Sequence, residues 1–279
     1  MTTADLHWAP PPFHPLVEAA IAAAQADPRV LGLTVGGSAA IGAMDEFSDL
    51  DFVVVCRDDD HPGLLRDAPD FAAGLGPLLT AFTGEHVREP RLLLCLFGPP
   101  PLRVDLLFVA DSDLDHRLED GRILWQRDGA LDTAIRRSPA VWPSVDPQRL
   151  EDRFWTWIHN GATKLGRGEF FACLEEIAFL RRMVFGPLIA QRRGHRPNGV
   201  RRLERIAPDL VLALAATIGD HTAPGCLRAM RAAIDLYQRL RGEFPDLVQR
   251  TGAETATLAY LAEIETRLAR DGLMNGGAP

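Results

Sequence analysis

The 279-residue sequence lacks any uninterrupted apolar run long enough to cross a membrane, and it lacks a basic-then-apolar leader at its start. These absences predict a cytoplasmic protein with no membrane partner. Cysteine is scarce, and the four cysteines show no paired spacing of the kind that binds zinc. Reduced, buried thiols are therefore expected rather than a disulfide framework. The cysteines are Cys56, Cys95, Cys173 and Cys226.

Lysine is scarcer still, because Lys164 is the only lysine among 30 basic residues. An ammonium group is a compact point charge that fits between phosphates, whereas the guanidinium group of arginine is planar and larger. We therefore interpret Lys164 as a candidate contact to a triphosphate. The alternative is that the single lysine stands at this position by chance.

Charge is distributed unevenly along the chain. Residues 1–150 carry 12 basic and 23 acidic groups, whereas residues 151–279 carry 18 and 15. An acidic first half disfavours nucleic acid as a partner, since nucleic acid is bound through neutralisation of its phosphates by Lys and Arg. Such a surface would attract a polycationic small molecule, although surplus carboxylates often form only a solvated face.

Paired glycines follow a short apolar run at residues 31–35, which is typical of a buried strand. Gly36 and Gly37 allow a sharp turn and a close approach of the backbone to a ligand. Ser38 is predicted to cap a short helix after the turn. The exposed N–H groups at such a helix start favour a polyphosphate, and the Ser38 hydroxyl adds a further donor.

Two carboxylates open the next expected strand, at residues 49–56. Asp49 and Asp51 are two residues apart, so the period of a strand places them on one face, while Leu50 and Phe52 point into the core. Neighbouring carboxylates repel each other unless a cation lies between them. Oxygen ligands of this kind suit Mg²⁺ that is shared with substrate phosphates.

A third carboxylate, Asp105, is the only charge in the apolar run at residues 104–109. Residues 91–97 and 102–109 read as two strands of a hairpin. A charge inside an apolar strand needs a partner, and a metal ion would serve. Two ions about 3.5–4 Å apart would require this third ligand. The alternative partner of Asp105 is the neighbouring Arg103.

The motif that begins with Gly37-Ser38 and continues through Ser48-Asp49-Leu50-Asp51 to a later single Asp resembles the polymerase-β-like nucleotidyltransferase superfamily. The spacing is similar to that of aminoglycoside and other antibiotic adenylyltransferases within it. The resemblance covers residues 30–109 well and the remainder loosely. It implies ATP as the donor, and one departure is Ile41, where many relatives carry Arg.

The fold class expected is an α/β (α+β) nucleotidyltransferase domain with a mixed sheet, followed by an all-α helical bundle. The predicted domains are residues 1–140 and 148–279, separated by a proline-rich stretch at 138–147. The helices expected in the first domain lie at 15–26 and within 62–82. Those expected in the second lie at 148–166, 169–193, 208–218, 224–243 and 253–271.

These observations predict transfer of a nucleoside monophosphate, AMP from ATP, to the hydroxyl of a small molecule such as an aminoglycoside-like antibiotic. The proposed catalytic and metal-binding residues are Asp49, Asp51 and Asp105, with two Mg²⁺ ions. The proposed nucleotide-binding residues are Gly37, Ser38 and Lys164. Candidates for a general base are Glu85, Glu89 and Glu169.

Two alternatives remain at this point. One is nucleotidylation of a protein or an RNA, as in toxin–antitoxin pairs, and the other is a non-catalytic nucleotide-binding regulatory protein. The sequence does not specify the oligomeric state.

Overall fold

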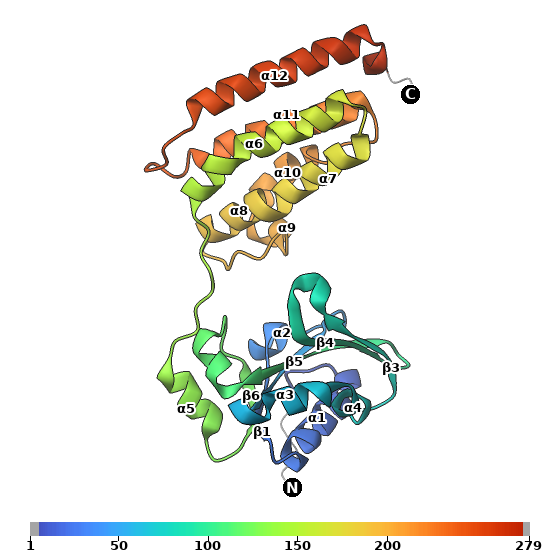
Figure 1. The fold of residues 1–279 in the computed structure, drawn as a ribbon, viewed down its shortest axis with the longest axis vertical. Coiled ribbons are helices and arrows are strands. Elements are labelled where there is room, and N and C mark those ends of the chain that lie inside the picture. The colour runs from blue at the N-terminus through green and yellow to red at the C-terminus, as the bar shows by residue number, and fades with distance from the viewer. Residues whose placement is uncertain (1–5, 276–279) are drawn as a thin grey trace. The chain divides into compact units, whose positions relative to one another are not determined.

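The computed structural model describes residues 6–275 and divides the chain into two compact units, Met1–Trp142 and Pro143–Pro279 (Figure 1). The first unit contains a mixed sheet with helices, and the second is built from helices. The predicted fold class is therefore confirmed. Within residues 6–275, no helix has both the length and the apolar character that a membrane crossing requires.

The sheet of the first unit has six strands in the order β3-β4-β5-β2-β1-β6. Only the β2–β5 pair is parallel, and the other neighbours are antiparallel. The strands are β1 (Val30–Val35), β2 (Leu50–Cys56), β3 (Leu78–Gly84), β4 (Glu89–Phe97), β5 (Leu102–Ala110) and β6 (Arg122–Gln126). The parallel register places Asp51 directly opposite Asp105.

Side chains alternate between the two faces of β2, as the strand period requires. Leu50, Phe52 and Val54 are buried in a core that they share with helix α1 (His14–Ala26). The other face carries Asp51 near the start of the strand and Val55 near its end. Val55 packs with Leu131 of helix α5 (Ala130–Arg137) in a smaller cluster.

Four of the six strands and the helix at 15–26 agree with the sequence analysis, including the antiparallel pairing of β4 with β5. Strands β3 and β6 were missed. The segment at 62–82, expected to contain helical segments, contains α3 (His61–Arg66) and α4 (Ala68–Ala73), so this prediction is confirmed, and the chain then continues into β3. Gly74, Gly76 and Pro77 stop the helix before the strand begins.

The helices of the second unit pack around one continuous apolar core. They are α6 (Pro147–Gly166), α7 (Phe170–Leu180), α8 (Gly186–Arg192), α9 (Leu203–Ile206), α10 (Val211–Ala216), α11 (Ala223–Arg241) and α12 (Thr251–Arg270). A π-helical turn, Arg181–Phe185, joins α7 to α8 where one continuous helix was expected. Trp155 is buried in this core, and Trp157 packs edge-on against Phe179.

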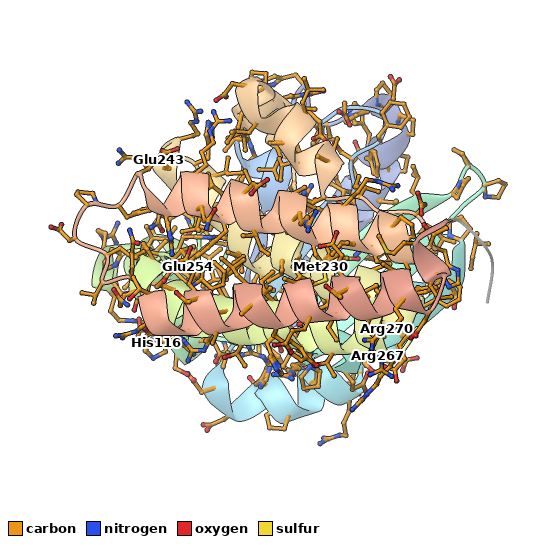
Figure 2. The ribbon with its side chains drawn as sticks, turned by 90° about the horizontal axis from the view of Figure 1, so that it is seen from above. His116, Met230, Glu243, Glu254, Arg267 and Arg270 are labelled. Atoms are coloured by element: carbon orange, nitrogen blue, oxygen red, sulfur yellow. The ribbon has the colours of Figure 1, made fainter. Side chains whose placement is uncertain are left out.

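Local charges support the helix ends of the second unit. The Asp146 side chain accepts hydrogen bonds from the backbone amides of Gln148 and Arg149, which caps α6. Helix α12 has Glu254 in its first turn and Arg267 and Arg270 in its last, as Figure 2 shows. Charges in these positions oppose the helix dipole and stabilise the ends.

One carboxylate is buried deep in the second unit. Glu151 is 1% exposed and accepts hydrogen bonds from Trp155 Nε1 at 3.2 Å, from Tyr237 Oη at 2.7 Å and from the Arg250 amide at 2.8 Å. The Arg241 guanidinium lies 3.4 Å from the same group. Burial of this carboxylate is thus matched by several donors, so its role in the helical core is structural.

Candidate metal and nucleotide site

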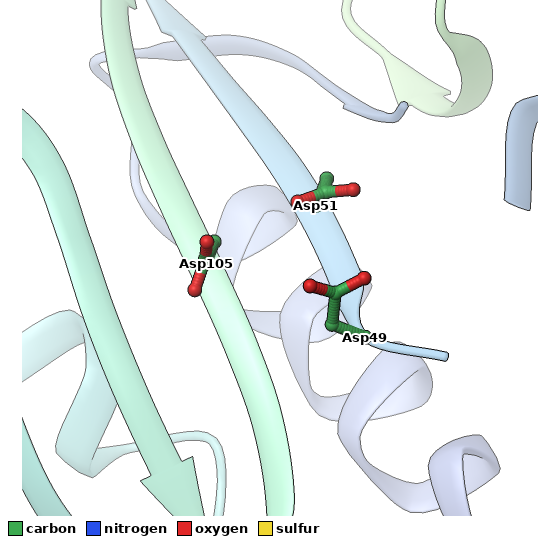
Figure 3. Close-up of side chains that lie close together, drawn as sticks. All are labelled: Asp49, Asp51 and Asp105. Atoms are coloured by element: carbon green, nitrogen blue, oxygen red, sulfur yellow. The ribbon is translucent and has the colours of Figure 1, made fainter. Parts of the chain in front are cut away.

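Three carboxylates converge on one face of the sheet in the first unit (Figure 3). Asp49 directly precedes β2, Asp51 lies within β2, and Asp105 lies on β5. One oxygen of each carboxylate lies within 4.8 Å of the others. The two-residue strand period and the parallel register of β2 with β5 together produce this cluster. The sequence analysis proposed the three residues as metal ligands but did not predict this register.

The cluster is electrostatically unfavourable for Asp51. Burial, together with the nearby charges of Asp49 and Asp105, raises the pKa of Asp51 to about 6. A cation bound among the three groups would offset this repulsion. Because the donors are all carboxylate oxygens, the set fits a hard cation such as Mg²⁺.

Arg103 supplies part of the counter-charge. Its guanidinium donates to both oxygens of Asp105, at 3.0 and 2.7 Å, and lies 3.9 Å from Asp49 Oδ2. The pairing that the sequence analysis gave as an alternative to a metal is therefore present. It engages Asp105 most closely and leaves the pKa of Asp51 raised.

The glycine turn lies against the same carboxylates. The Gly36 amide donates to the Asp51 carbonyl oxygen at 2.8 Å, which ties the turn to β2. Gly37 has a φ of 58°, and a Cβ atom there would lie 2.5 Å from Asp51 Oδ2. Only glycine fits this position without strain, because other residues rarely adopt that φ and the carboxylate occupies the space.

The short helix after the turn, α2 (Gly37–Ala40), begins two residues earlier than a Ser38 cap would place it. Its N-cap is Gly36, and no side chain caps it, so the predicted capping role of Ser38 is wrong. The reason is that β1 ends at Val35 and the chain turns at once into the helix. Ile41, the position of the departure from the family pattern, is 72% exposed.

Glu119 was missed by the sequence analysis. Its carboxylate accepts a hydrogen bond from the Gly37 amide at 2.9 Å, so an internal anion occupies a donor that the sequence analysis assigned to phosphate. Glu119 lies in the irregular segment between the 3-10 helix η4 (Asp111–His116) and strand β6. Gly121 is the one local signal, because a Cβ atom there would lie 2.7 Å from Thr34 Oγ1, so a glycine is needed for this segment to pass close to β1.

Two of the remaining predicted residues, Lys164 and Glu89, have ion-pair partners of their own. Lys164 lies on α6 of the second unit, where its ammonium group is 2.8 Å from Glu176 Oε2. Glu89 forms a bidentate pair with Arg91, with both distances at 2.7 Å. Glu85 and Glu169 are exposed. The nucleotide role of Lys164 and the identity of a general base stay predictions.

Of the comparisons with known proteins, the one with solved structures is the one that finds similar proteins. No family model matches the sequence, and no curated protein matches it. An aminoglycoside 6-adenyltransferase from Bacillus subtilis is similar with a TM-score of 0.38 and 14% identity, over 89% of this chain and 97% of that one. A nucleotidyltransferase-like protein from Exiguobacterium sibiricum is similar with a TM-score of 0.36 and 13% identity, over 92% of each chain.

Both proteins are of the kind that the sequence motif resembles. At these scores the similarity carries no inference about function. The function has to be inferred from the carboxylate cluster and the glycine turn.

Proposed function

We propose that this protein transfers AMP from ATP to a hydroxyl of a small molecule, with release of pyrophosphate. The observation that carries the proposal is the convergence of Asp49, Asp51 and Asp105 beside the Gly36-Gly37-Ser38 turn. Each element alone is common in proteins that bind no nucleotide. Their combination provides neighbouring places for a cation and for phosphate groups.

Asp49, Asp51 and Asp105 would hold two Mg²⁺ ions, which would supply Lewis-acid stabilisation of charge on the phosphates. Gly37 and Ser38 would hold the outer phosphates through backbone and hydroxyl donors. For this, the Glu119 carboxylate has to leave the Gly37 amide to which it is now bound.

In the transfer step, the acceptor oxygen forms a bond to the α-phosphorus while the bond from that phosphorus to the bridging oxygen of pyrophosphate breaks. The hydroxyl proton leaves to a carboxylate, for which we propose Asp105. Positioning by the protein and stabilisation of phosphate charge contribute most of the rate enhancement in such reactions. We further propose that Lys164 stabilises the departing pyrophosphate.

In this proposal residues 1–140 act as the nucleotidyltransferase domain and residues 148–279 as a helical domain that contributes Lys164. The acceptor is a small hydroxylated molecule, and the aminoglycoside class is one candidate because the first unit is acidic. Antibiotic resistance would be the biological consequence of that activity.

The test uses ATP labelled at the α-phosphate, Mg²⁺ and a panel of aminoglycosides and lincosamides. The expected result is a labelled small molecule formed in equal amount with pyrophosphate. Asp49→Asn should abolish the transfer, whereas Asp59→Asn, at an exposed carboxylate outside the cluster, should leave it unchanged. Label on a protein or an RNA would favour the first alternative function, and absence of nucleotide binding would refute the proposal.

A further inference from the structure

A cavity of about 450 Å³ borders the carboxylate cluster within the first unit. It lies on the face of the sheet that carries Asp51 and Asp105, and both side chains line it. Along β2 the next residue on this face is Val53, and along β5 it is Leu107. The wall of the cavity therefore changes from charged to apolar along both strands.

The apolar end of the cavity is closed by helix α5. Leu131 is 1% exposed and packs with Val55 and Val109, the last residues of this face on β2 and β5. Ile135, one turn further along α5, lines the same cavity. A ligand that enters beside the carboxylates would thus place its far end against aliphatic side chains.

The charged part of the wall is acidic. It contains six carboxylates against two arginines. Arg91 is bound by Glu89 at 2.7 Å and by Asp113 at 3.0 Å, and Arg117 is bound by Asp120 at 2.6 Å. Both positive charges are thus neutralised locally, and Arg103 offsets the charge of Asp105. The six carboxylates still outnumber these three arginines, so the excess charge that a ligand meets is negative.

The position of the cavity distinguishes the acceptor from the nucleotide. Gly36, Asp51 and Asp105 line it. The proposed phosphate contacts, Gly37 and Ser38, do not, and neither does Asp49. In an in-line displacement the attacking oxygen and the leaving pyrophosphate stand on opposite sides of the α-phosphorus. With the phosphates at the glycine turn, the side that faces Asp105 and the cavity belongs to the acceptor.

We infer that this cavity binds the acceptor, and that the acceptor is a cationic amphiphile. Such a molecule carries a protonated amine for the acidic wall, an apolar group for the closed end and the hydroxyl that receives the nucleotide. The volume suits a drug-sized molecule, since ligand pockets span roughly 300–1,000 Å³. This inference rests on the proposed function and narrows its acceptor to molecules that have an apolar body.

The inference can be tested by calorimetry with a graded series of probes. N-methylglucamine and N-hexylglucamine share an amine and the same hydroxyls and differ in alkyl length, while hexyl glucoside has the alkyl chain without the amine. N-hexylglucamine should bind at least tenfold more tightly than either of the other two, because each buried methylene adds affinity. Equal affinity of the three probes would overturn the inference.

Filling the cavity provides the second part of the test. Leu107→Trp should weaken N-hexylglucamine at least tenfold while changing the affinity for Mg²⁺ and α,β-methylene-ATP less than twofold. Ile135→Trp, from the opposite wall, serves if circular dichroism shows that Leu107→Trp is unfolded. Leu79→Trp, on the exposed side of β3, is the matched control and should bind like the parent protein.

The outcomes separate the two proposals. If Leu107→Trp weakens the nucleotide analogue and spares N-hexylglucamine, the cavity holds the nucleoside and the inference is wrong. If the parent protein binds N-hexylglucamine through the cavity but binds no nucleotide, the proposed transfer reaction fails and the assignment of an amphiphile to the cavity is supported.

Discussion

Glu151 in the helical unit and Asp51 in the sheet unit have opposite surroundings. Glu151 in the helical unit is surrounded by donors from Trp155, Tyr237 and Arg250. Asp51 in the sheet unit lies beside other carboxylates, and burial together with their charges raises its pKa to about 6. A protein maintains donors around a charge that serves its fold, whereas repulsion within a cluster is typical of a site that binds a cation. The contrast supports the proposal that the functional site lies in the sheet unit.

The largest expected effect follows from removing a charge from the cluster. Asp49→Asn or Asp105→Asn should lower the rate of AMP transfer by about a thousandfold, which corresponds to roughly 4 kcal/mol in the barrier. Pyrophosphate release under saturating ATP measures the rate. Thermal unfolding of Asp49→Asn should stay near that of the parent protein. A normal transfer rate in either variant would contradict the contrast between the two units.

The converse change in the helical unit should affect stability rather than catalysis. Glu151→Ala removes the common partner of several buried donors and should cost about 3–5 kcal/mol of unfolding free energy. Urea denaturation monitored by tryptophan fluorescence measures this cost. Glu243→Ala is the control, because its pair with Arg192 is at the surface and should contribute less than about 1 kcal/mol.

Asp51→Asn should raise the unfolding free energy of the metal-free protein, whereas Glu151→Ala should lower it. A carboxyl whose pKa is raised from 3.8 to about 6 destabilises the folded state above pH 6, and this effect disappears as the pH falls toward 4. The expected gain at pH 7.5 is about 1–3 kcal/mol, because one pKa unit corresponds to about 1.4 kcal/mol.

Thermal unfolding at pH 7.5 and at pH 4 measures this gain. The difference between the variant and the parent protein should be present at pH 7.5 and absent at pH 4. Addition of Mg²⁺ should stabilise only the parent protein, since ligand binding to the folded state raises its stability. A destabilised variant at pH 7.5 would show that burial of the Asp51 charge and repulsion from Asp49 and Asp105 do not destabilise the folded protein.

The glycine turn should show an effect of similar size to that of Asp51→Asn but of opposite direction. Gly37→Ala should destabilise the first unit by about 1–3 kcal/mol, because the residue has a positive φ and the added Cβ meets Asp51. The affinity for α,β-methylene-ATP should fall as well. Gly129→Ala is the matched control, since Gly129 also has a positive φ but a Cβ there meets nothing within 4 Å. Equal changes of stability and of nucleotide affinity in the two variants would show that the position of Gly37 beside Asp51 has no special effect.

The carboxylate cluster could be predicted because its causes are local in sequence. The spacing of Asp49 and Asp51 fixes their common face through the strand period, and Asp105 is conspicuous as the only charge in the apolar run at residues 104–109. Their convergence also needed the parallel register of β2 and β5, which sequence spacing alone does not give.

Other parts of the structure depend on contacts that no local pattern records. Strands β3 and β6 form the two edges of the sheet, and their burial does not alternate as in a half-buried strand. Glu119 reaches the Gly37 amide from an irregular segment 82 residues away. Such a contact follows from the path of the chain over the sheet, so neither periodicity nor spacing could predict it.

The most direct test of the account counts metal ions at the cluster. Mn²⁺ titrations followed by electron paramagnetic resonance, with α,β-methylene-ATP present, should show about two ions per chain in the parent protein. Asp49→Asn should lose at least one of them, and Asp59→Asn should lose none. Binding that is absent from the parent protein, or unchanged in Asp49→Asn, would contradict a metal-dependent nucleotidyl transfer at this site.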